Sequence, residues 1–312
     1  MLACLPTQEI ADAVGPVDGV DVLVWDLLGE RPQRADEIEF LLTPQFMRRA
    51  ALETIATLPA LRHVQLVSAG FEHAVPYVPA GVSLSNAPGV HDTATAELAL
   101  TLTLAAQRRL PDFVRAQQRG RWETRISPGL ADRRVLVVGY GNIGHAITRR
   151  LLPFETQVTA VASRARDGDD LVAHVHGIDE LPALLPEHDV VVLIVPLTDS
   201  TTGLVDAGFI EAMKPGALLV NVARGKVVDT QALMAACERG RIRAALDVTD
   251  PEPLPDGHPL FATPGVLVAP HVGGYSEAFT PRIGRFARAQ LEAYRDGEPL
   301  AGVQIPATPE GA

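Results

Sequence analysis

The sequence has little cysteine and no long apolar run. Its two cysteines, Cys4 and Cys237, stand in no metal-ligand or redox spacing, so we expect both to be packing residues. No apolar run approaches the roughly 18 residues of a membrane-spanning helix. The N-terminal stretch MLACLPTQEI also lacks the basic region and apolar core of a secretory signal. We therefore expect a cytoplasmic protein with no membrane segment.

Net positive charge is lacking as well. The formal charge of -11 at pH 7 argues against a general nucleic-acid binder, which needs a basic patch to replace counterions. Hydrophobic residues make up 47% of the chain and charged residues 21%, which is a globular composition. A chain of 312 residues can bury a substantial core, in one large domain or two of ordinary size.

Short apolar runs alternate with amphipathic stretches along the whole chain, which favours βα units around parallel sheets. The first series of apolar runs fits a small α/β layer. The second has six strands and fits a doubly wound, Rossmann-type sheet. We expect strands at 20–26, 39–42 and 63–68, then at 134–139, 157–162, 190–196, 217–223, 244–248 and 266–271, helices at 45–57, 91–110, 229–240 and 276–297, and an edge strand within 299–304.

The stretch VLVVGYGNIGHAI places Gly139, Gly141 and Gly144 in a GxGxxG arrangement between a predicted strand and a predicted helix. In a dinucleotide site the first glycine makes the tight turn, the second lets backbone approach the pyrophosphate, and the third lets helix pack on strand. The helix N-terminus, with Asn142 and Ile143, then attracts the anion. The alternative is a structural turn that binds nothing.

An acidic residue is missing where the second strand of this unit ends. Dinucleotide-binding folds usually hold the ribose hydroxyls there with Asp or Glu, but this chain has Ala162, followed by Ser163 and Arg164. Without the carboxylate a 2′-phosphate is not repelled, and Arg164 can bind it beside the Ser163 hydroxyl. We therefore predict NADP(H) over NAD(H). The alternative is a solvated loop in which the acidic stretch 167–170 pairs with Arg164 or Arg166.

Three further motifs point to the chemistry. LVNVARG brings Arg224 to the end of a strand, DPEP holds Glu252 in the loop after another, and APHVGG brings His271 to the end of the last. Carboxyl ends of parallel strands share one edge, so these groups can converge. His271 can donate a proton to a reduced carbonyl, Glu252 can orient the imidazole, and Arg224 can bind a substrate carboxylate. Taken singly, each could instead be a surface, turn or core residue.

These motifs, together with SAGFEH, GVSLSNAPGVHDTATAELAL, PLTDSTTGLV and ALDVTDPEPLP, resemble those of the D-isomer-specific 2-hydroxyacid dehydrogenase family. Within it the pattern is most similar to glyoxylate/hydroxypyruvate reductase and phosphoglycerate dehydrogenase. The resemblance implies that Arg224, Glu252 and His271 are the catalytic residues. It also implies that the backbone amides of Ala69 and Gly70 bind the substrate carboxylate, with Arg224 and His271 as further substrate contacts.

The same resemblance implies the domain organisation and further cofactor contacts. It implies a discontinuous, flavodoxin-like substrate-binding domain at 1–93 and 278–312, and a dinucleotide-binding Rossmann domain at 94–277. Asp247 and Pro196 become cofactor residues by analogy. A homodimer is also implied.

The leading hypothesis is a reductase that transfers hydride between NADP(H), with NAD possible, and a small 2-keto or 2-hydroxy acid such as glyoxylate or hydroxypyruvate. The alternatives are a phosphoglycerate-dehydrogenase-like enzyme that uses NAD and a non-catalytic NAD(P)-sensing protein of the corepressor type. We expect no metal, because the pair His174 and His176 has no evident third ligand. Arg108 and Arg109 either bind substrate or face solvent.

Overall fold

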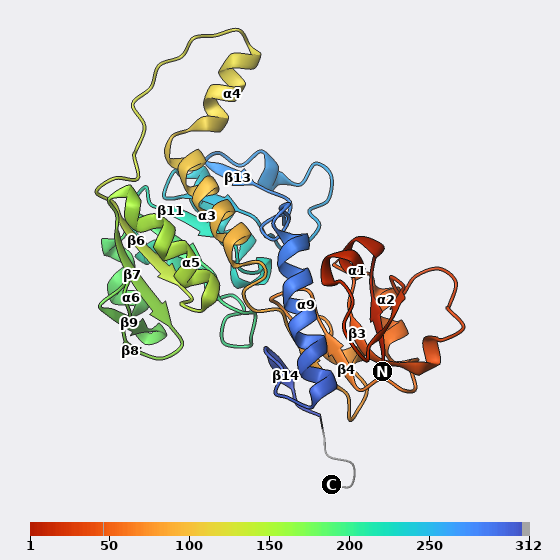
Figure 1. The fold of residues 1–312 in the computed structure, drawn as a ribbon. Helices are drawn as coiled ribbons and strands as arrows, with labels where there is room; N and C mark the ends of the chain where they lie inside the picture. The colour runs from red at the N-terminus through yellow and green to blue at the C-terminus, as the bar shows by residue number, and fades with distance from the viewer. Residues whose placement is uncertain (46, 308–312) are drawn as a thin grey trace. The chain divides into compact units, whose positions relative to one another are not determined.

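The structure is a computed structural model that describes residues 1–45 and 47–307. The chain divides into two compact units, each built around its own sheet (Figure 1). Unit 1 comprises Met1–His91 and Tyr275–Ala312, and unit 2 comprises Asp92–Gly274. Among the described residues, no helix is both long and apolar enough to cross a membrane.

Unit 2 contains an eight-stranded sheet in the order β13-β12-β11-β10-β6-β7-β9-β8, in which only β8 runs antiparallel to its neighbour. Counted from β6, the order is that of a Rossmann sheet, with the reversal of strand order between β6 and β10. The six strands predicted for this series are confirmed, and the two short strands β8 and β9 were not predicted. The strands are β6 (Arg134–Val138), β7 (Gln157–Ala162), β8 (Arg166–Asp167), β9 (His174–Gly177), β10 (Val190–Leu193), β11 (Leu218–Asn221), β12 (Arg243–Leu246) and β13 (Val266–Val268).

Unit 1 contains a six-stranded sheet in the order β14-β5-β4-β3-β1-β2, parallel except for β14. Its first five strands in chain order give the flavodoxin-like arrangement 2-1-3-4-5, as predicted. The edge strand predicted near the end of the chain is confirmed as β14. The strands are β1 (Leu2–Leu5), β2 (Asp21–Val24), β3 (Ile38–Leu42), β4 (His63–Gln65), β5 (Ser83–Ser85) and β14 (Val303–Ile305).

No strand or helix was predicted for residues 1–19, yet they contain the buried strand β1 and the helix α1. All four residues of β1 are buried, so the strand shows no alternation of polar and apolar residues. The side chain of Thr7 caps α1 by accepting a hydrogen bond from the backbone N–H of Ile10. The helices are α1 (Gln8–Val14), α2 (Arg49–Ile55), α3 (Asp92–Gln107), α4 (Leu110–Gln118), α5 (Asn142–Leu151), α6 (Leu181–Leu184), α7 (Ala207–Ala212), α8 (Thr230–Glu238) and α9 (Phe279–Asp296).

The single long helix predicted over 91–110 is wrong in its last turn. Helix α3 ends at Gln107, and Arg109 adopts a left-handed backbone with φ of 56°. A second helix, α4, then begins with Pro111 in its first turn, where proline's missing N–H has no helical partner to lose. Figure 1 shows α4 and the segment after it standing away from the sheet of unit 2.

Candidate active site

The glycine-rich turn of unit 2 has the local geometry of a phosphate-binding loop. Gly139 follows β6 with φ of 107°, and a Cβ there would lie 2.3 Å from the carbonyl oxygen of Ile194. A Cβ on Gly144 would lie 2.0 Å from the Gly139 oxygen, so helix α5 packs on the turn only with glycine at 144. Gly141, by contrast, faces open space within 4 Å. Its backbone at the α5 N-terminus is therefore open to an anionic ligand.

A cavity of about 700 Å³ lies beside this turn and is lined by Asp92, Thr93, Tyr140, Gly141, Asn142, His145, Ala146, Arg149, Arg150, Arg166 and Asp169. Sequence reasoning assigned no role to Tyr140 and considered Asp169 only as a partner for Arg164 or Arg166. The Tyr140 hydroxyl donates to the Asp169 carboxylate at 3.0 Å, and Arg166 donates to the Tyr140 carbonyl oxygen at 2.7 Å. The signal for this network was the tyrosine between the first two glycines, followed by an acidic stretch after the second strand.

The segment after β7 is exposed. Ser163 and Arg164 both lie in solvent, directly after Ala162 at the strand end. Arg164 makes no hydrogen bond or ion pair within residues 1–45 and 47–307. Arg164 therefore does not pair with the acidic stretch 167–170, as the alternative required. Asp169 and Asp170 instead lie near His145 Nε2, at 3.6 and 3.7 Å. The cation of Arg164 is thus available to a ligand.

The three catalytic candidates follow neighbouring strands of unit 2. Arg224 comes after β11, His271 comes after β13, and Glu252 lies in the loop after β12, which is between those two strands in the sheet. Close packing joins two of these segments, since a Cβ on Gly225 would lie 1.8 Å from the carbonyl oxygen of Thr249. Only glycine after Arg224 permits that approach.

His271 and Glu252 are in direct contact through a short hydrogen bond between Nδ1 and Oε1. Their side chains are 48% and 40% exposed. The hydrogen bond to Glu252 raises the pKa of His271 above its ordinary value, against the effect of partial burial. Burial, the largest single effect, acts to raise the pKa of Glu252, but the hydrogen bond and charge of His271, a backbone hydrogen bond at Thr249 and the charge of Arg224 together hold this pKa below its ordinary value. The pair favours a protonated imidazole beside a carboxylate.

Asp247 holds the backbone that carries His271. Its carboxylate accepts hydrogen bonds from the N–H groups of Val272 at 2.7 Å and Gly273 at 3.0 Å, and its carbonyl oxygen accepts one from the His271 N–H at 2.7 Å. His271 has φ of 54°, a left-handed conformation that costs a β-carbon residue about 1–2 kcal/mol. The Asp247 side chain is buried, and burial raises the pKa of its carboxyl group. Asp247 therefore fixes the strained histidine.

Arg224 lies close enough to the pair to act on both pKa values, lowering that of Glu252 and opposing the rise at His271. Buried Asn221 holds the turn before Arg224, donating to the Arg224 carbonyl at 3.0 Å and accepting from the Ala223 N–H at 3.0 Å. Sequence reasoning missed Asn221, although a polar residue in the apolar run LLVNVA was the available signal.

The remaining site residues lie in two other places. Pro196 is exposed after β10 of unit 2, and its carbonyl oxygen accepts from the Thr201 hydroxyl at 2.6 Å. Ala69 and Gly70 lie in unit 1, in the loop after β4, with their carbonyl oxygens bonded to Asn86 and Ser68. Their backbone N–H groups have no acceptor in the described part of the chain. The two amides can therefore serve an anion.

Comparison with known proteins identifies the family. The model of the family described as "D-isomer specific 2-hydroxyacid dehydrogenase, NAD binding domain" matches residues 100–273. A glyoxylate reductase/hydroxypyruvate reductase of Mus musculus is 38% identical over 225 residues, which is 68% of this chain and 67% of that protein. A glyoxylate reductase of Thermococcus gammatolerans is 31% identical over 310 residues, which is 91% of each chain.

Solved structures agree over nearly the whole chain. A D-isomer specific 2-hydroxyacid dehydrogenase from Xanthobacter autotrophicus, in complex with NADPH and MES, is similar with a TM-score of 0.81 and 29% identity, covering 98% of this chain and 99% of that one. A family member from Aeromonas salmonicida has a TM-score of 0.84 with 26% identity at the same coverage. The chain therefore belongs to the D-isomer specific 2-hydroxyacid dehydrogenase family and is an NAD(P)-dependent oxidoreductase that acts on 2-keto and 2-hydroxy acids.

Proposed function

We propose that this enzyme reduces a small 2-keto acid, glyoxylate or hydroxypyruvate, with NADPH as the preferred cofactor. The observation that carries the proposal is the hydrogen-bonded pair of His271 and Glu252 at the strand ends of unit 2, with Arg224 beside it. The relatives named glyoxylate reductase or hydroxypyruvate reductase support this substrate class.

His271 is the proton donor in this proposal. The nicotinamide, when bound, supplies hydride to the carbonyl carbon of the keto acid. Negative charge then develops on the carbonyl oxygen, and the protonated imidazole of His271 delivers its proton there. Glu252 keeps the imidazole oriented and charged by accepting from Nδ1, which leaves Nε2 to face the substrate. In the oxidation direction His271 takes the proton back.

Arg224 binds the substrate and stabilises charge. Its guanidinium can hold the carboxylate and the carbonyl oxygen of the keto acid together, because its donors form a planar fork. The backbone N–H groups of Ala69 and Gly70 in unit 1, which have no acceptor among the described residues, stay proposed contacts of the substrate carboxylate by family resemblance. These assignments predict that the substrate must carry a carboxylate next to the carbonyl.

The glycine-rich turn between β6 and α5 is the proposed pyrophosphate site. Gly139, Gly141 and Gly144, with Asn142 and Ile143, would hold the pyrophosphate at the N-terminus of α5.

The cofactor preference rests on the segment after β7. The 2′-phosphate would meet Ser163 and Arg164, which pairs with none of the described residues, and no carboxylate stands at Ala162 to repel it. The similar Xanthobacter structure, which contains NADPH, supports this choice. Asp247 and Pro196 are proposed to contact the cofactor as well.

Absorbance at 340 nm separates the candidate functions. We expect turnover of glyoxylate or hydroxypyruvate, with a higher kcat/KM for NADPH than for NADH. Equal or better turnover with NADH, especially in the oxidation of phosphoglycerate, would favour the phosphoglycerate-dehydrogenase-like alternative. Tight NADPH binding without turnover of any 2-keto acid would favour the sensor of the corepressor type.

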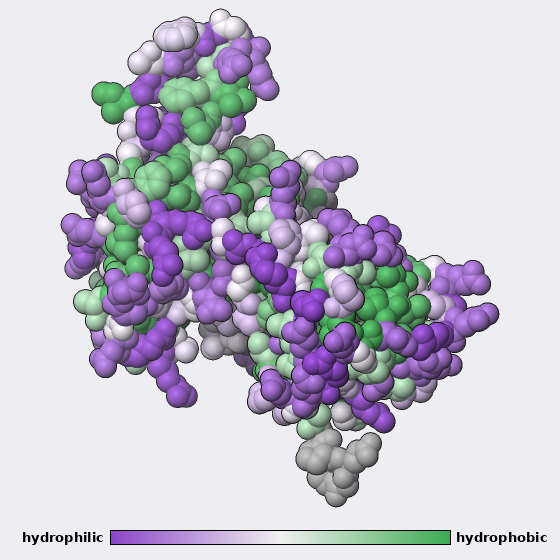
Figure 2. Space-filling view, viewed as in Figure 1, coloured by the Kyte–Doolittle hydropathy of each residue, from purple (hydrophilic) through white to green (hydrophobic). Residues whose placement is uncertain are grey.

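We also propose a homodimer and a cytoplasmic location. Helix α4 and the segment after it expose large apolar side chains: Leu110 is 50% exposed, Val114 52%, Trp122 98% and Ile126 101%. Figure 2 shows apolar residues on this projecting part. A second copy of the chain would cover them.

Two measurements test the dimer. Sedimentation equilibrium should give twice the chain mass, and Trp122→Ser should shift the protein toward monomer. Cell fractionation tests the location.

A further inference from the structure

We propose that His174, His176 and Glu180 form a surface site for a divalent transition metal, Zn²⁺ in the first instance, with water completing the coordination. The site is on unit 2 and is separate from the catalytic residues of the proposed function. No step of the hydride transfer requires it.

Strand geometry brings the two histidines together. They stand two residues apart on β9, and successive side chains of a strand point to opposite faces. Val175 and Gly177 are buried, whereas His174 is exposed and His176 half-buried, so both imidazoles share the outer face. Their ring centroids are 4.8 Å apart in an edge-on arrangement. The spacing of the two rings is thus set by the backbone.

Glu180 supplies the third ligand that the sequence did not reveal. It ends a short 3₁₀ helix, Ile178–Glu180, which turns the chain back toward β9. Its Oε1 accepts from the Gly177 N–H at 2.8 Å and its Oε2 lies 2.8 Å from His176 Nδ1. The sequence showed no evident third ligand beside His174 and His176, and the structure places the Glu180 carboxylate there. One ligand atom from each of the three residues lies within 4.8 Å of the others.

The donor set suits zinc. Two imidazole nitrogens and one carboxylate oxygen, with water in the fourth position, form a known tetrahedral arrangement. Metal–ligand bonds of about 2.0–2.2 Å place neighbouring ligand atoms roughly 3.3–3.5 Å apart. The hydrogen bond between His176 and Glu180 must open by about half an ångström to admit the metal, which side-chain rotation alone can supply. Imidazole ligands also favour Ni²⁺ and Cu²⁺ over Mg²⁺ or Ca²⁺.

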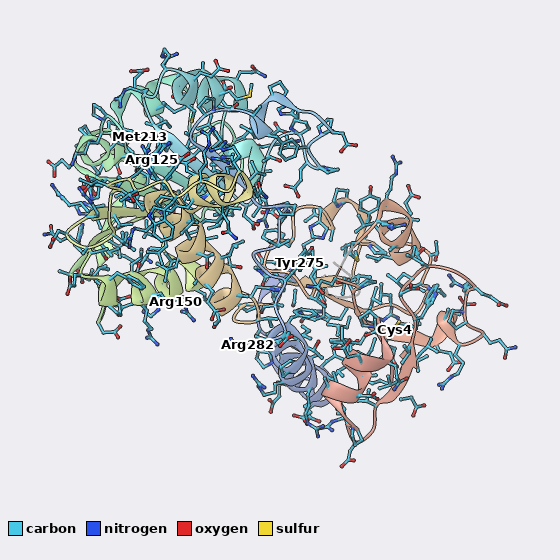
Figure 3. All side chains as sticks on the ribbon, turned by 90° about the horizontal axis from the view of Figure 1, so that it is seen from above. Cys4, Arg125, Arg150, Met213, Tyr275 and Arg282 are labelled. Carbon is cyan, nitrogen blue, oxygen red and sulfur yellow. The ribbon has the colours of Figure 1, made fainter. Side chains whose placement is uncertain are left out.

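The other possible cluster in unit 2 fits a metal less well. His145, Asp169 and Asp170 offer only one nitrogen. Asp169 already accepts hydrogen bonds from the Tyr140 hydroxyl and from backbone N–H groups in its own loop. Neither cysteine competes, because Cys237 is buried and Cys4, labelled in Figure 3, lies on the buried strand β1 of unit 1.

Metal binding would stabilise one edge of the unit 2 sheet. Strand β9 pairs with β7, with Ala162 opposite Gly177, and with β8, with Asp167 opposite His174. A metal held by β9 and by Glu180 ties this strand to the turn that follows it. Because the metal binds the folded state and not the separated ligands of the unfolded chain, it should raise the unfolding temperature.

The test uses the full chain, stripped with a chelator and titrated with Zn²⁺ against a chromophoric chelator. We expect one equivalent of Zn²⁺ per chain. The affinity should fall at least tenfold in both His174→Ala and Glu180→Gln, since each removes a direct ligand and loss of a mere partner of a ligand already costs roughly 10–100-fold. His145→Ala is the matched control and should bind as the unmodified protein does. Unchanged affinity in His174→Ala and Glu180→Gln would overturn the site, and loss in His145→Ala alone would move it to the other cluster.

Thermal unfolding gives a second, activity-independent measurement. Saturating Zn²⁺ should raise Tm in the unmodified protein and in His145→Ala, but not in His174→Ala. An equal rise in all three, or no rise in any, would contradict the proposal. Each variant is compared with its own metal-free Tm, so a loss of stability caused by the substitution does not obscure the result.

Discussion

Two strand ends of unit 2 differ in how their functional side chains are held. After β13, His271 is bonded to Glu252, and its backbone is fixed by three hydrogen bonds from its segment to Asp247. After β7, Arg164 is exposed and bonded to no described residue. The difference indicates that the proposed proton donor is preorganised by the protein, whereas the proposed contact of the 2′-phosphate is left for its ligand to order.

The largest expected effect comes from a substitution at the strand end after β13, where His271 lies. His271→Ala should lower kcat for keto-acid reduction by about 10²–10⁴-fold, because it removes the proposed general acid. NADPH affinity, measured by fluorescence titration, should change little, since the proposed cofactor contacts lie elsewhere. Turnover preserved in this variant would remove the proton-donor assignment and, with it, the contrast between the two ends.

At the strand end after β7, we expect a substitution to weaken NADPH binding and to leave the chemical step unchanged. Arg164→Ala should lower kcat/KM for NADPH by roughly 10–150-fold, the loss of a hydrogen bond to a charged group worth about 1.5–3 kcal/mol. The kcat/KM for NADH should hardly change. Arg49→Ala, which removes an exposed arginine of unit 1 paired with Glu53, is the control. A parallel loss with both cofactors would show that Arg164 does not read the 2′-phosphate.

A pH profile sharpens the role of Glu252. The pKa of His271 is raised by this carboxylate, so the acid form needed for reduction is present below that pKa and is lost as pH rises through it. Glu252→Gln removes the charge, so the fall in kcat/KM should move to lower pH. At neutral pH, kcat/KM of Glu252→Gln should be about 10–100-fold below that of the unmodified enzyme, a smaller loss than removal of the imidazole causes. If the pH profile does not move, Glu252 does not set the pKa that controls kcat/KM.

The smallest predicted effect concerns Asp247. Asp247→Asn leaves one acceptor oxygen for two backbone N–H groups, so one of them loses its partner in a buried place. The free energy of unfolding should fall by about 1–3 kcal/mol, measured by urea denaturation. The kcat should fall as well, because the left-handed backbone at His271 is then held less firmly. Unchanged stability and turnover would mean that the rest of the loop fixes the histidine.

Much of the fold could be predicted because parallel strands and amphipathic helices leave periodic patterns. The strand β1 could not, since it is short and buried throughout. The break between α3 and α4 was also missed: one helix was predicted over 91–110, whereas Pro111 lies in the first turn of a second helix. The flavodoxin-like and Rossmann strand orders rest on the general rules for βα units, which the sequence obeys.

The candidate active site could also be predicted only in part. By itself the sequence determined which residue types stand at which strand ends: Arg224, Asp247 and His271 in unit 2, and Ala162 where an acid is usual. Only the tertiary structure decided that Glu252 bonds His271, that Asp247 fixes the histidine backbone, and that Glu180 turns back to the histidine pair on β9. The physical reason is that a motif specifies local backbone, whereas a hydrogen bond between loops depends on the packing that brings the loops within 3 Å.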